Sequence, residues 1–238
     1  MAHDHYQLVT ISDGKSDAAA IMQIFTGIFD GRLKGDVRLL NYCNEVPVSY
    51  AATVKSVASD SVELSIHEHQ AQLLKQSNST LIRSRHFDKG LGVHAYAAYV
   101  NVAKQAVILH NFAYAQVKAE RREAVRVRVG GALPVQFFCD HIVITGAMID
   151  ISANGVSILA SSPLPATVEG AGLLSFNLLD TPLTMPATFV RAKSTEGNQQ
   201  MAIFTIAPDR ITDAVIGKFI YQRQVEVISA LKEGLYMD

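Results

Sequence analysis

The sequence predicts a mainly β protein built from two β-barrel domains, with one helix near the N-terminus and another at the C-terminus. Short apolar runs separated by turn-prone residues recur over about 36–116, as an antiparallel barrel or sandwich requires. A charged interruption at about 115–122 breaks this pattern, and similar runs then resume. Stretches with apolar residues at helical spacing flank the strand-like runs. With 238 residues, 49% of them hydrophobic, the chain is long enough for two cores.

Charge and cysteine content exclude several classes of protein. The net charge is −1, so no global positive field attracts nucleic acid or anionic lipid, and any anion site must be local. Cys43 and Cys139 lack Cys-x-x-Cys spacing, and the chain does not begin like a signal peptide. The most apolar helical stretch, 21–29, is far shorter than the roughly 20 residues that span a bilayer. We expect a cytoplasmic protein without membrane insertion.

The first element is a helix predicted from about 15 to 31, after a flexible N-terminal arm at 1–14. Asp13 or Ser16 could cap its start, and Gly31 suits its C-terminal end. Apolar residues at i, i+3 and i+4 form its buried stripe, which consists of Ile21, Ile24, Phe25, Ile28 and Phe29.

The strand-like runs fall into two groups. The first lies in a domain expected at 15–116, and a hinge at 117–128 separates it from a second domain expected at 129–238. Asn154-Gly155 supplies a two-residue hairpin signal in the second group. The runs of the first group are 37–40, 46–57, 61–67, 79–85, 92–102 and 106–112. Those of the second are 125–129, 133–140, 142–151, 155–161, 172–178, 183–192 and 200–206.

The last element is a helix predicted from about 208 to 231. Ile211, Val215, Phe219 and Ile228 are expected on its apolar side. The helix could cover its own barrel or pair with a second subunit in a homodimer. Periodicity alone does not choose between the two.

Two polar segments of the second half are candidates for one binding site. Arg122 and Arg126 lie four residues apart just before an alternating strand, and each guanidinium can bind an anion or a guanine edge bidentately. Downstream, the chain reads Asp150-Ile-Ser152-Ala-Asn-Gly155. Alone, the first segment is typical of a solvated hinge and the second of a hairpin. Their conjunction favours a ligand site.

The side chains of Asp150 and Ser152 are expected on an exposed face. They alternate with Ile149 and Ile151, and successive side chains of a strand point to opposite faces. With the isoleucines buried, the polar side chains would face solvent.

Arg122-x-x-x-Arg126 followed by Asp150-x-Ser152-x-x-Gly155 resembles the two-part signature of the PilZ domain. The β-rich segment and short helix before it resemble the layout of the YcgR type. The resemblance implies an N-terminal YcgR-like split barrel and a C-terminal six-stranded antiparallel PilZ barrel. It also implies cyclic di-GMP as the ligand, with no other cofactor.

Cyclic di-GMP carries two phosphodiester charges and two guanines. In the role that the resemblance implies, Arg122 and Arg126 would bind the O6 and N7 acceptors of guanine or a phosphate. Asp150 would accept from the guanine N1–H and N2–H₂ donors, and Ser152 would add a hydroxyl. Gly155 would provide a positive φ and allow close approach of the ligand.

Arg121 directly precedes this signature. In the family the ligand binds as one molecule or as an intercalated pair, so a further guanidinium here could stack on or bridge a second molecule. Alternatively, Arg121 faces solvent or pairs with Glu120 or Glu123. The ligand stoichiometry separates these alternatives.

The sequence predicts a binding protein and no enzyme. It contains no Gly-x-Ser-x-Gly elbow, Walker loop, His-Glu-x-x-His motif or dinucleotide fingerprint. His67 and His69 would share one face of a strand, as a metal pair might, but no third ligand accompanies them. A surface histidine pair without metal is therefore expected.

The resemblance implies a receptor that transmits a signal. Ligand binding would change the orientation of the two domains, and a protein partner such as the flagellar motor would respond. The receptor would then control motility or biofilm formation, and it could be recruited to the flagellar basal body. The alternative is a cyclic di-GMP-responsive transcription regulator that contacts DNA through the first domain. Near-neutral charge and the lack of a recognition helix count against it. The complete signature counts against a third alternative, a degenerate PilZ scaffold.

Overall fold

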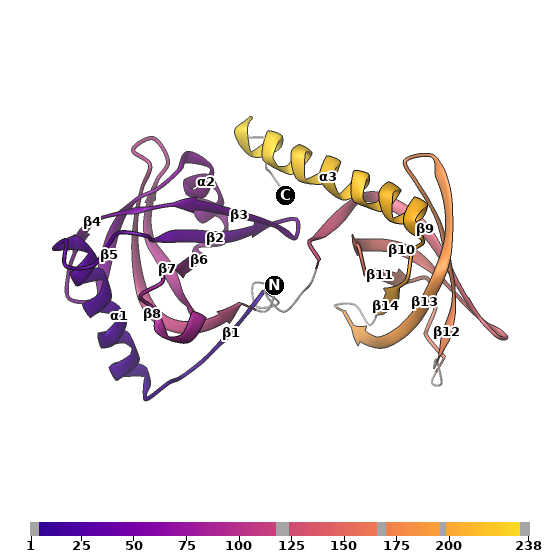
Figure 1. Ribbon diagram of the computed structural model, residues 1–238, viewed down its shortest axis with the longest axis horizontal. Coiled ribbons are helices and arrows are strands. Elements are labelled where there is room, and N and C mark those ends of the chain that lie inside the picture. Colours follow the sequence, from indigo (N-terminus) through magenta and orange to yellow (C-terminus); the bar gives the residue numbers. More distant parts are fainter. Residues whose placement is uncertain (1–4, 118–123, 166–169, 196–198, 234–238) are drawn as a thin grey trace. The chain divides into compact units, whose positions relative to one another are not determined.

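The computed structural model describes residues 5–117, 124–165, 170–195 and 199–233 (Figure 1). It divides into two compact units. Unit 1 comprises Met1–Cys43, Pro47–Glu123 and Ala230–Asp238, and unit 2 comprises Asn44–Val46 and Ala124–Ser229. The predicted mainly β architecture with a helix near each end is confirmed.

Unit 1 is an open, antiparallel half-barrel. Its eight-stranded sheet has the order β3-β2-β6-β7-β8-β5-β4, and β1 pairs with β8 (Figure 1). A core that includes Leu39, Leu64, Ile82 and Leu109 lies between the sheet and the first helix. The elements are β1 (Tyr6–Leu8), α1 (Gly14–Phe29), β2 (Arg38–Cys43), β3 (Val46–Ala51), β4 (Thr53–Val57), β5 (Ser61–Ser65), α2 (Glu68–Ser77), β6 (Ser79–Arg83), the 3₁₀ turn η1 (Asp88–Gly90), β7 (Gly92–Asn101) and β8 (Ala106–Val117).

Part of the segment expected as a flexible arm is a strand. Tyr6 is the Cα partner of Val117, and Leu8 that of Ala115. The Tyr6 side chain is 6% exposed, and its ring stacks on that of His94 at 4.6 Å between centroids. The sequence pattern missed β1 because three residues are too few to show an alternation.

Helix α1 follows the predicted pattern with small shifts. Asp13 is its N-cap and accepts from the backbone N–H groups of Lys15 and Ser16. Ile21 and Phe25 of the predicted stripe are fully buried, whereas Phe29 is 50% exposed. Phe29 is the last residue of the helix.

The expected surface pair of histidines is wrong. His67 is the N-cap of α2 and accepts from the backbone N–H of His69 at 3.2 Å. The prediction of a strand at these histidines missed this helix. His69 is only 4% exposed, and its Nδ1 lies 2.9 Å from the Tyr50 hydroxyl. The Tyr50 ring stacks on that of His67 at 3.8 Å. Both imidazoles therefore belong to local packing.

Asp36 joins the start of β2 to the segment after β6. Its carboxylate accepts from Ser84 Oγ at 2.6 Å, Arg85 N at 3.0 Å and Arg85 Nε at 2.7 Å. Burial alone would raise the pKa of Asp36, but these donors outweigh that effect and lower the pKa to about 2. Because the folded-state pKa lies below the unfolded value, this stabilisation is present above pH 4 or so and is lost as the pH falls towards 2.

Replacing Asp36 by Asn is expected to lower the free energy of unfolding at pH 7 by about 1–2 kcal/mol, a value reduced because solvent screens the exposed Arg85. The difference from the unmodified protein should shrink towards zero near pH 2. Urea unfolding at a series of pH values measures it. The exposed Asp60, replaced by Asn, is the control, and an undiminished deficit at pH 2 would contradict the assignment.

Unit 2 is the predicted closed barrel of six antiparallel strands (Figure 1). The strand order is β10-β11-β14-β13-β12-β9. Phe137, Ile151, Ile158 and Phe204 fill its interior and are at most 1% exposed. The elements are β9 (Arg126–Cys139), β10 (Ile142–Ser152), β11 (Gly155–Ala160), β12 (Ala171–Leu178), β13 (Thr181–Ser194), β14 (Gln200–Ile206) and α3 (Arg210–Lys232).

The buried side of α3 differs from the predicted one. Thr212, Ile216 and Ile220 are buried, whereas Ile211 and Ile228, expected on the apolar side, are 77% and 38% exposed. The helix carries apolar residues on two faces, so periodicity alone does not identify the one that packs inward.

Candidate binding site on the outer face of the barrel

A bulge in the barrel wall aligns the two polar segments. Met148 of β10 pairs with Leu133 of β9, but the next paired residue, Asp150, faces Arg128, so residues 129–132 bulge out opposite Ile149. Within the bulge Gly131 has a φ of +86°, a conformation that glycine adopts without steric cost. The start of β9 can therefore pair with the end of β10.

The same bulge changes which side chains of β10 face the core. Before it, Ile144 and Met148 are buried at even-numbered positions, and after it Ile151 becomes the fully buried residue. Asp150 and Ser152 therefore lie on the outer face. Their expected exposure is wrong, however, because they are only 9% and 1% exposed.

The register places Arg126, Ser152 and Gly155 in one row across three strands. Ser152 is the Cα partner of Arg126 on one side and of Gly155 on the other. A Cβ added to Gly155 would lie 3.3 Å from the backbone oxygen of Phe204, 3.5 Å from Ser152 Oγ and 3.7 Å from Arg126 Nη2. Glycine therefore keeps open the space beside the guanidinium.

A second row contains Arg128, Asp150 and Ser157. Ser157 Oγ donates to Asp150 Oδ1 at 2.9 Å, and Arg126 Nη1 lies 3.5 Å from the same oxygen. Sequence reasoning missed Ser157, although it lies two positions after Gly155 and so shares its strand face. Asp150 is thus oriented from two sides, by a hydroxyl and by a cation.

Arg126 has a buried donor that no other described residue satisfies. Its Nε is buried and has no hydrogen-bond acceptor among the described residues. Leaving a buried donor unpaired costs about 1–3 kcal/mol, and more for a charged group. The position therefore suits an acceptor supplied by a ligand.

The hairpin expected at Asn154-Gly155 is shifted by one residue. Ser152 pairs with Gly155, so Ala153 and Asn154 occupy the turn and Gly155 begins β11. Gly155 does not have the expected positive φ. The tight approach of the Phe204 backbone oxygen, rather than the backbone angles of Gly155, therefore favours glycine at this position.

Four of the six predicted site residues are brought together: Arg126, Asp150, Ser152 and Gly155. Arg121 and Arg122 lie outside the described residues.

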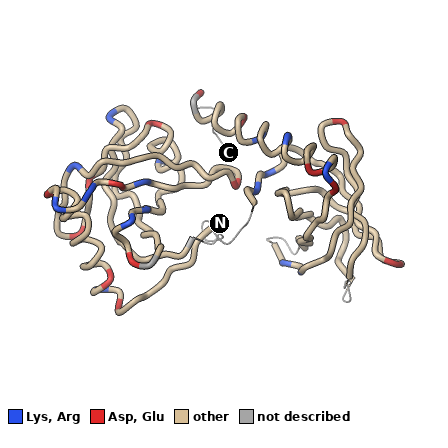
Figure 2. The backbone as a smooth tube through the Cα atoms, in the orientation of Figure 1, with Lys and Arg blue, Asp and Glu red and all other residues tan. Residues whose placement is uncertain are grey.

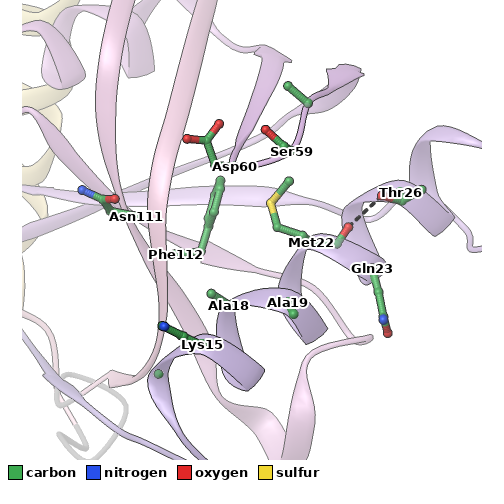
Figure 3. A pocket seen from close by; sticks show the side chains of 12 residues that line it. Lys15, Ala18, Ala19, Met22, Gln23, Thr26, Ser59, Asp60, Asn111 and Phe112 are labelled. Atoms are coloured by element: carbon green, nitrogen blue, oxygen red, sulfur yellow. Dashed lines mark hydrogen bonds between the residues drawn. The ribbon is translucent and has the colours of Figure 1, made fainter.

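A separate hollow of about 770 Å³ lies in unit 1, between α1, β8 and the β4–β5 turn (Figure 3). Lys15, Asp60 and Asn111 line it from three different elements, beside Met22 and Phe112. None of the four predicted site residues that the structure describes lines it.

The described residues contain no group of three or more His, Cys, Asp or Glu placed to hold a metal ion. None of the described helices combines the length and apolar character needed to cross a bilayer.

Comparisons with known proteins agree with this arrangement in unit 2. Residues 120–222 match the family model of the PilZ domain. No curated protein sequence matches the chain.

Solved structures similar to the whole chain share little sequence with it. The Bacillus subtilis inhibitor of motility MotI is 13% identical, with 81% of this chain and 97% of that chain covered and a TM-score of 0.43. Escherichia coli YcgR, solved in complex with c-di-GMP, is 10% identical, with coverages of 93% and 99% and a TM-score of 0.43. The K. pneumonia MrkH–c-di-GMP complex is 11% identical, with coverages of 94% and 99% and a TM-score of 0.45. The family match and the closed six-stranded barrel together identify residues 120–222 of this chain as a PilZ domain.

Proposed function

We propose that this chain is a cyclic di-GMP receptor that binds its ligand on the outer face of the PilZ barrel. The observation that carries the proposal is the buried Arg126 Nε, which lacks an acceptor among the described residues and lies in a row with Ser152 and Gly155. A guanidinium in this setting suits the phosphate oxygens or the O6 and N7 edge of a guanine.

Each residue of the site has a distinct role in this proposal. Arg126 supplies the charged fork, and Asp150 accepts from the N1–H and N2–H₂ donors that distinguish guanine from adenine. Ser152 contributes a hydroxyl, and the missing side chain of Gly155 leaves room for the ligand beside the guanidinium. Arg122 supplies the second guanidinium of the signature.

Calorimetric titration of the full chain with cyclic di-GMP tests this proposal, with GTP and cyclic di-AMP as controls. We expect saturable heat with cyclic di-GMP alone, and its loss in an Asp150→Ala variant that remains folded. A folded protein that gives no heat and shows no competition at high ligand concentration would overturn the receptor function. A stoichiometry of two ligands per chain would support a bridging role for Arg121, and the comparison with Arg121→Ala tests it directly.

Ser157 is proposed as a positioning residue that orients Asp150. Replacing it by Ala should weaken cyclic di-GMP binding by roughly 3- to 10-fold, because one hydrogen bond of about 1 kcal/mol is lost while the barrel core is unchanged. In an Asp150→Ala background the same replacement should have no further effect. Ser175→Ala, which removes a half-buried hydroxyl of β12 that is hydrogen-bonded to Thr184 and lies outside the predicted site, is the matched control. Additive losses in the double variant would refute the positioning role.

The proposed output is a change in the orientation of the two units. Residues 118–123 connect β8 of unit 1 to unit 2 along the chain and contain Arg121 and Arg122, so a ligand held by these arginines and by the barrel would restrain the connection. A ligand shifts such an equilibrium only through its different affinity for the two arrangements. Energy transfer between one dye on each unit, measured with and without cyclic di-GMP, should change; an unchanged distance distribution at saturation would refute the switch.

The proposed partner is a protein, and the flagellar motor is the specific candidate. Purified motor components should bind the chain with an affinity that changes on addition of cyclic di-GMP. Equal binding with and without ligand would contradict a regulated motor contact.

The alternative, a transcription regulator, requires binding to DNA. The net charge is −1, and basic and acidic residues are interspersed along both units (Figure 2), which offers little attraction to a polyanion. Ligand-dependent DNA binding that weakens steeply with salt would favour this alternative over the protein partner.

A further inference from the structure

The outward side of α3 carries a second apolar stripe. Ile211, Tyr221, Val225 and Ile228 are 77%, 67%, 48% and 38% exposed. With the exposed Ala214 and Lys218, they follow the spacing of the a and d positions of three consecutive heptads: 211, 214, 218, 221, 225 and 228. The inward-facing Thr212, Ile216 and Ile220 do not belong to this series. The helix therefore has one face for its own barrel and another with the period of a coiled-coil seam.

A hollow on α3 has the composition of a coiled-coil hole. Arg210, Ile211, Ala214, Val215 and Lys218 line it, and its volume is about 630 Å³. The last four occupy positions i, i+3, i+4 and i+7, which is the set of four side chains that surrounds an inserted knob of a facing helix. The small Ala214 leaves the hollow open at its centre. The spacing of the residues that line the hollow thus fits another helix.

We propose that α3 pairs with α3 of a second copy of this chain in a short antiparallel coiled coil. In a parallel pair, Lys218 would face the second copy's Lys218 at an a position, and the two like charges would repel. In an antiparallel pair centred between Lys218 and Tyr221, each ammonium faces the second copy's Tyr221 ring, an arrangement that allows a cation–π contact.

The same antiparallel register matches the remaining side chains by size. Ile211 faces the second copy's Ile228, and Ala214 faces the second copy's Val225, which enters the hollow as the knob. The flanking positions in the middle of the seam, Val215, Gln222 and Gln224, carry no charge and so create no repulsion in this register, and the charged Arg210 flanks the end of the seam. The interface is isologous, as a two-fold dimer requires.

The dimer is reversible, because one pair of helices with three heptads buries much less surface than an obligate interface. Sedimentation velocity of the full chain over a range of concentrations should show a monomer–dimer equilibrium. Val225→Glu should shift the midpoint by at least roughly 30-fold in concentration or leave only monomer, because it places a charge in the apolar hollow. Asp213→Asn changes the charge of α3 by the same one unit at an exposed position outside the a, d and flanking positions, and it should leave the equilibrium nearly unchanged.

Circular dichroism and thermal unfolding serve to check that each variant is folded. Both substituted positions are exposed, so we expect the fold to be retained. Disulfide trapping tests the orientation. Ala214→Cys mixed with Val225→Cys should form the crossed dimer, whereas efficient trapping of Ala214→Cys with itself would overturn the antiparallel register. A monomeric chain at all concentrations, or a dimer unaffected by Val225→Glu, would overturn the proposal. These measurements need no cyclic di-GMP, so their outcome is independent of the proposed receptor function.

Discussion

Replacing Arg126 by Ala is expected to weaken cyclic di-GMP binding by roughly 100-fold or more and to leave the PilZ barrel folded. Truncating one partner of a buried, hydrogen-bonded charge pair costs about 2–5 kcal/mol. In this variant the ligand would lose a charged donor fork, and Asp150 would lose the nearby positive charge. The barrel should tolerate the change, because the Arg126 side chain lies on the outer face and the core residues Val127 and Ile151 are retained. Titration calorimetry with cyclic di-GMP measures the loss.

Two further variants separate bidentate binding by the Arg126 guanidinium from the effect of its positive charge alone. Arg126→Lys keeps the positive charge but lacks the planar fork, so it should recover only part of the affinity. Arg83→Ala removes an exposed arginine from a strand of unit 1 and should bind like the unmodified protein. If Arg126→Lys binds as well as the unmodified protein, the contact is a simple charge effect and the bidentate role is wrong.

The barrel and the alignment of the two polar segments could be predicted from local sequence signals. Turn residues separate runs that are long enough to close a six-stranded barrel, and the resemblance to the PilZ signature implies that Arg126 lies near Asp150. The two segments do meet, with Arg126 directly opposite Ser152.

The surroundings of the site could not be predicted, because they depend on pairing between distant strands. The bulge at residues 129–132 is recognisable only once β9 is aligned with β10. It turns Ile151 inward and leaves Asp150 and Ser152 on the outer face, yet neighbouring groups bury both. The contact between Asp150 and Ser157 likewise requires the β10–β11 register.

The buried side of α3 was predicted wrongly for a different reason. A helical period identifies a stripe only when the other face is polar, and here Ile211 and Val225 lie on one face while Ile216 and Ile220 lie on another. Choosing the buried stripe requires knowing where the barrel lies. Ile211 was predicted to be buried but is exposed, so it belongs to an apolar face that does not pack on the barrel. Such a face is available for a partner.

Replacing Gly146 by Ala is expected to destabilise the PilZ barrel by about 2–4 kcal/mol, because the new methyl group has no space in the closed wall. A Cβ at this position would lie 2.2 Å from the backbone oxygen of Leu159 and 3.1 Å from Cα of Ala160. Both atoms belong to the paired strand β11, so relief requires β10 and β11 to move apart. Thermal unfolding should show the midpoint of the barrel transition lowered by roughly 10 °C or more.

The matched control is Gly217→Ala on α3, where an added Cβ meets nothing within 4 Å. Alanine is the better helix former by about 1 kcal/mol, so this variant should be as stable as the unmodified protein or slightly more stable. The opposite signs expected for the same chemical change separate steric exclusion in the barrel wall from a general cost of losing glycine. A Gly146→Ala barrel that unfolds at the unmodified temperature would mean that β10 and β11 can separate freely, and the rigid register proposed to hold Asp150 beside Ser157 would then be in error.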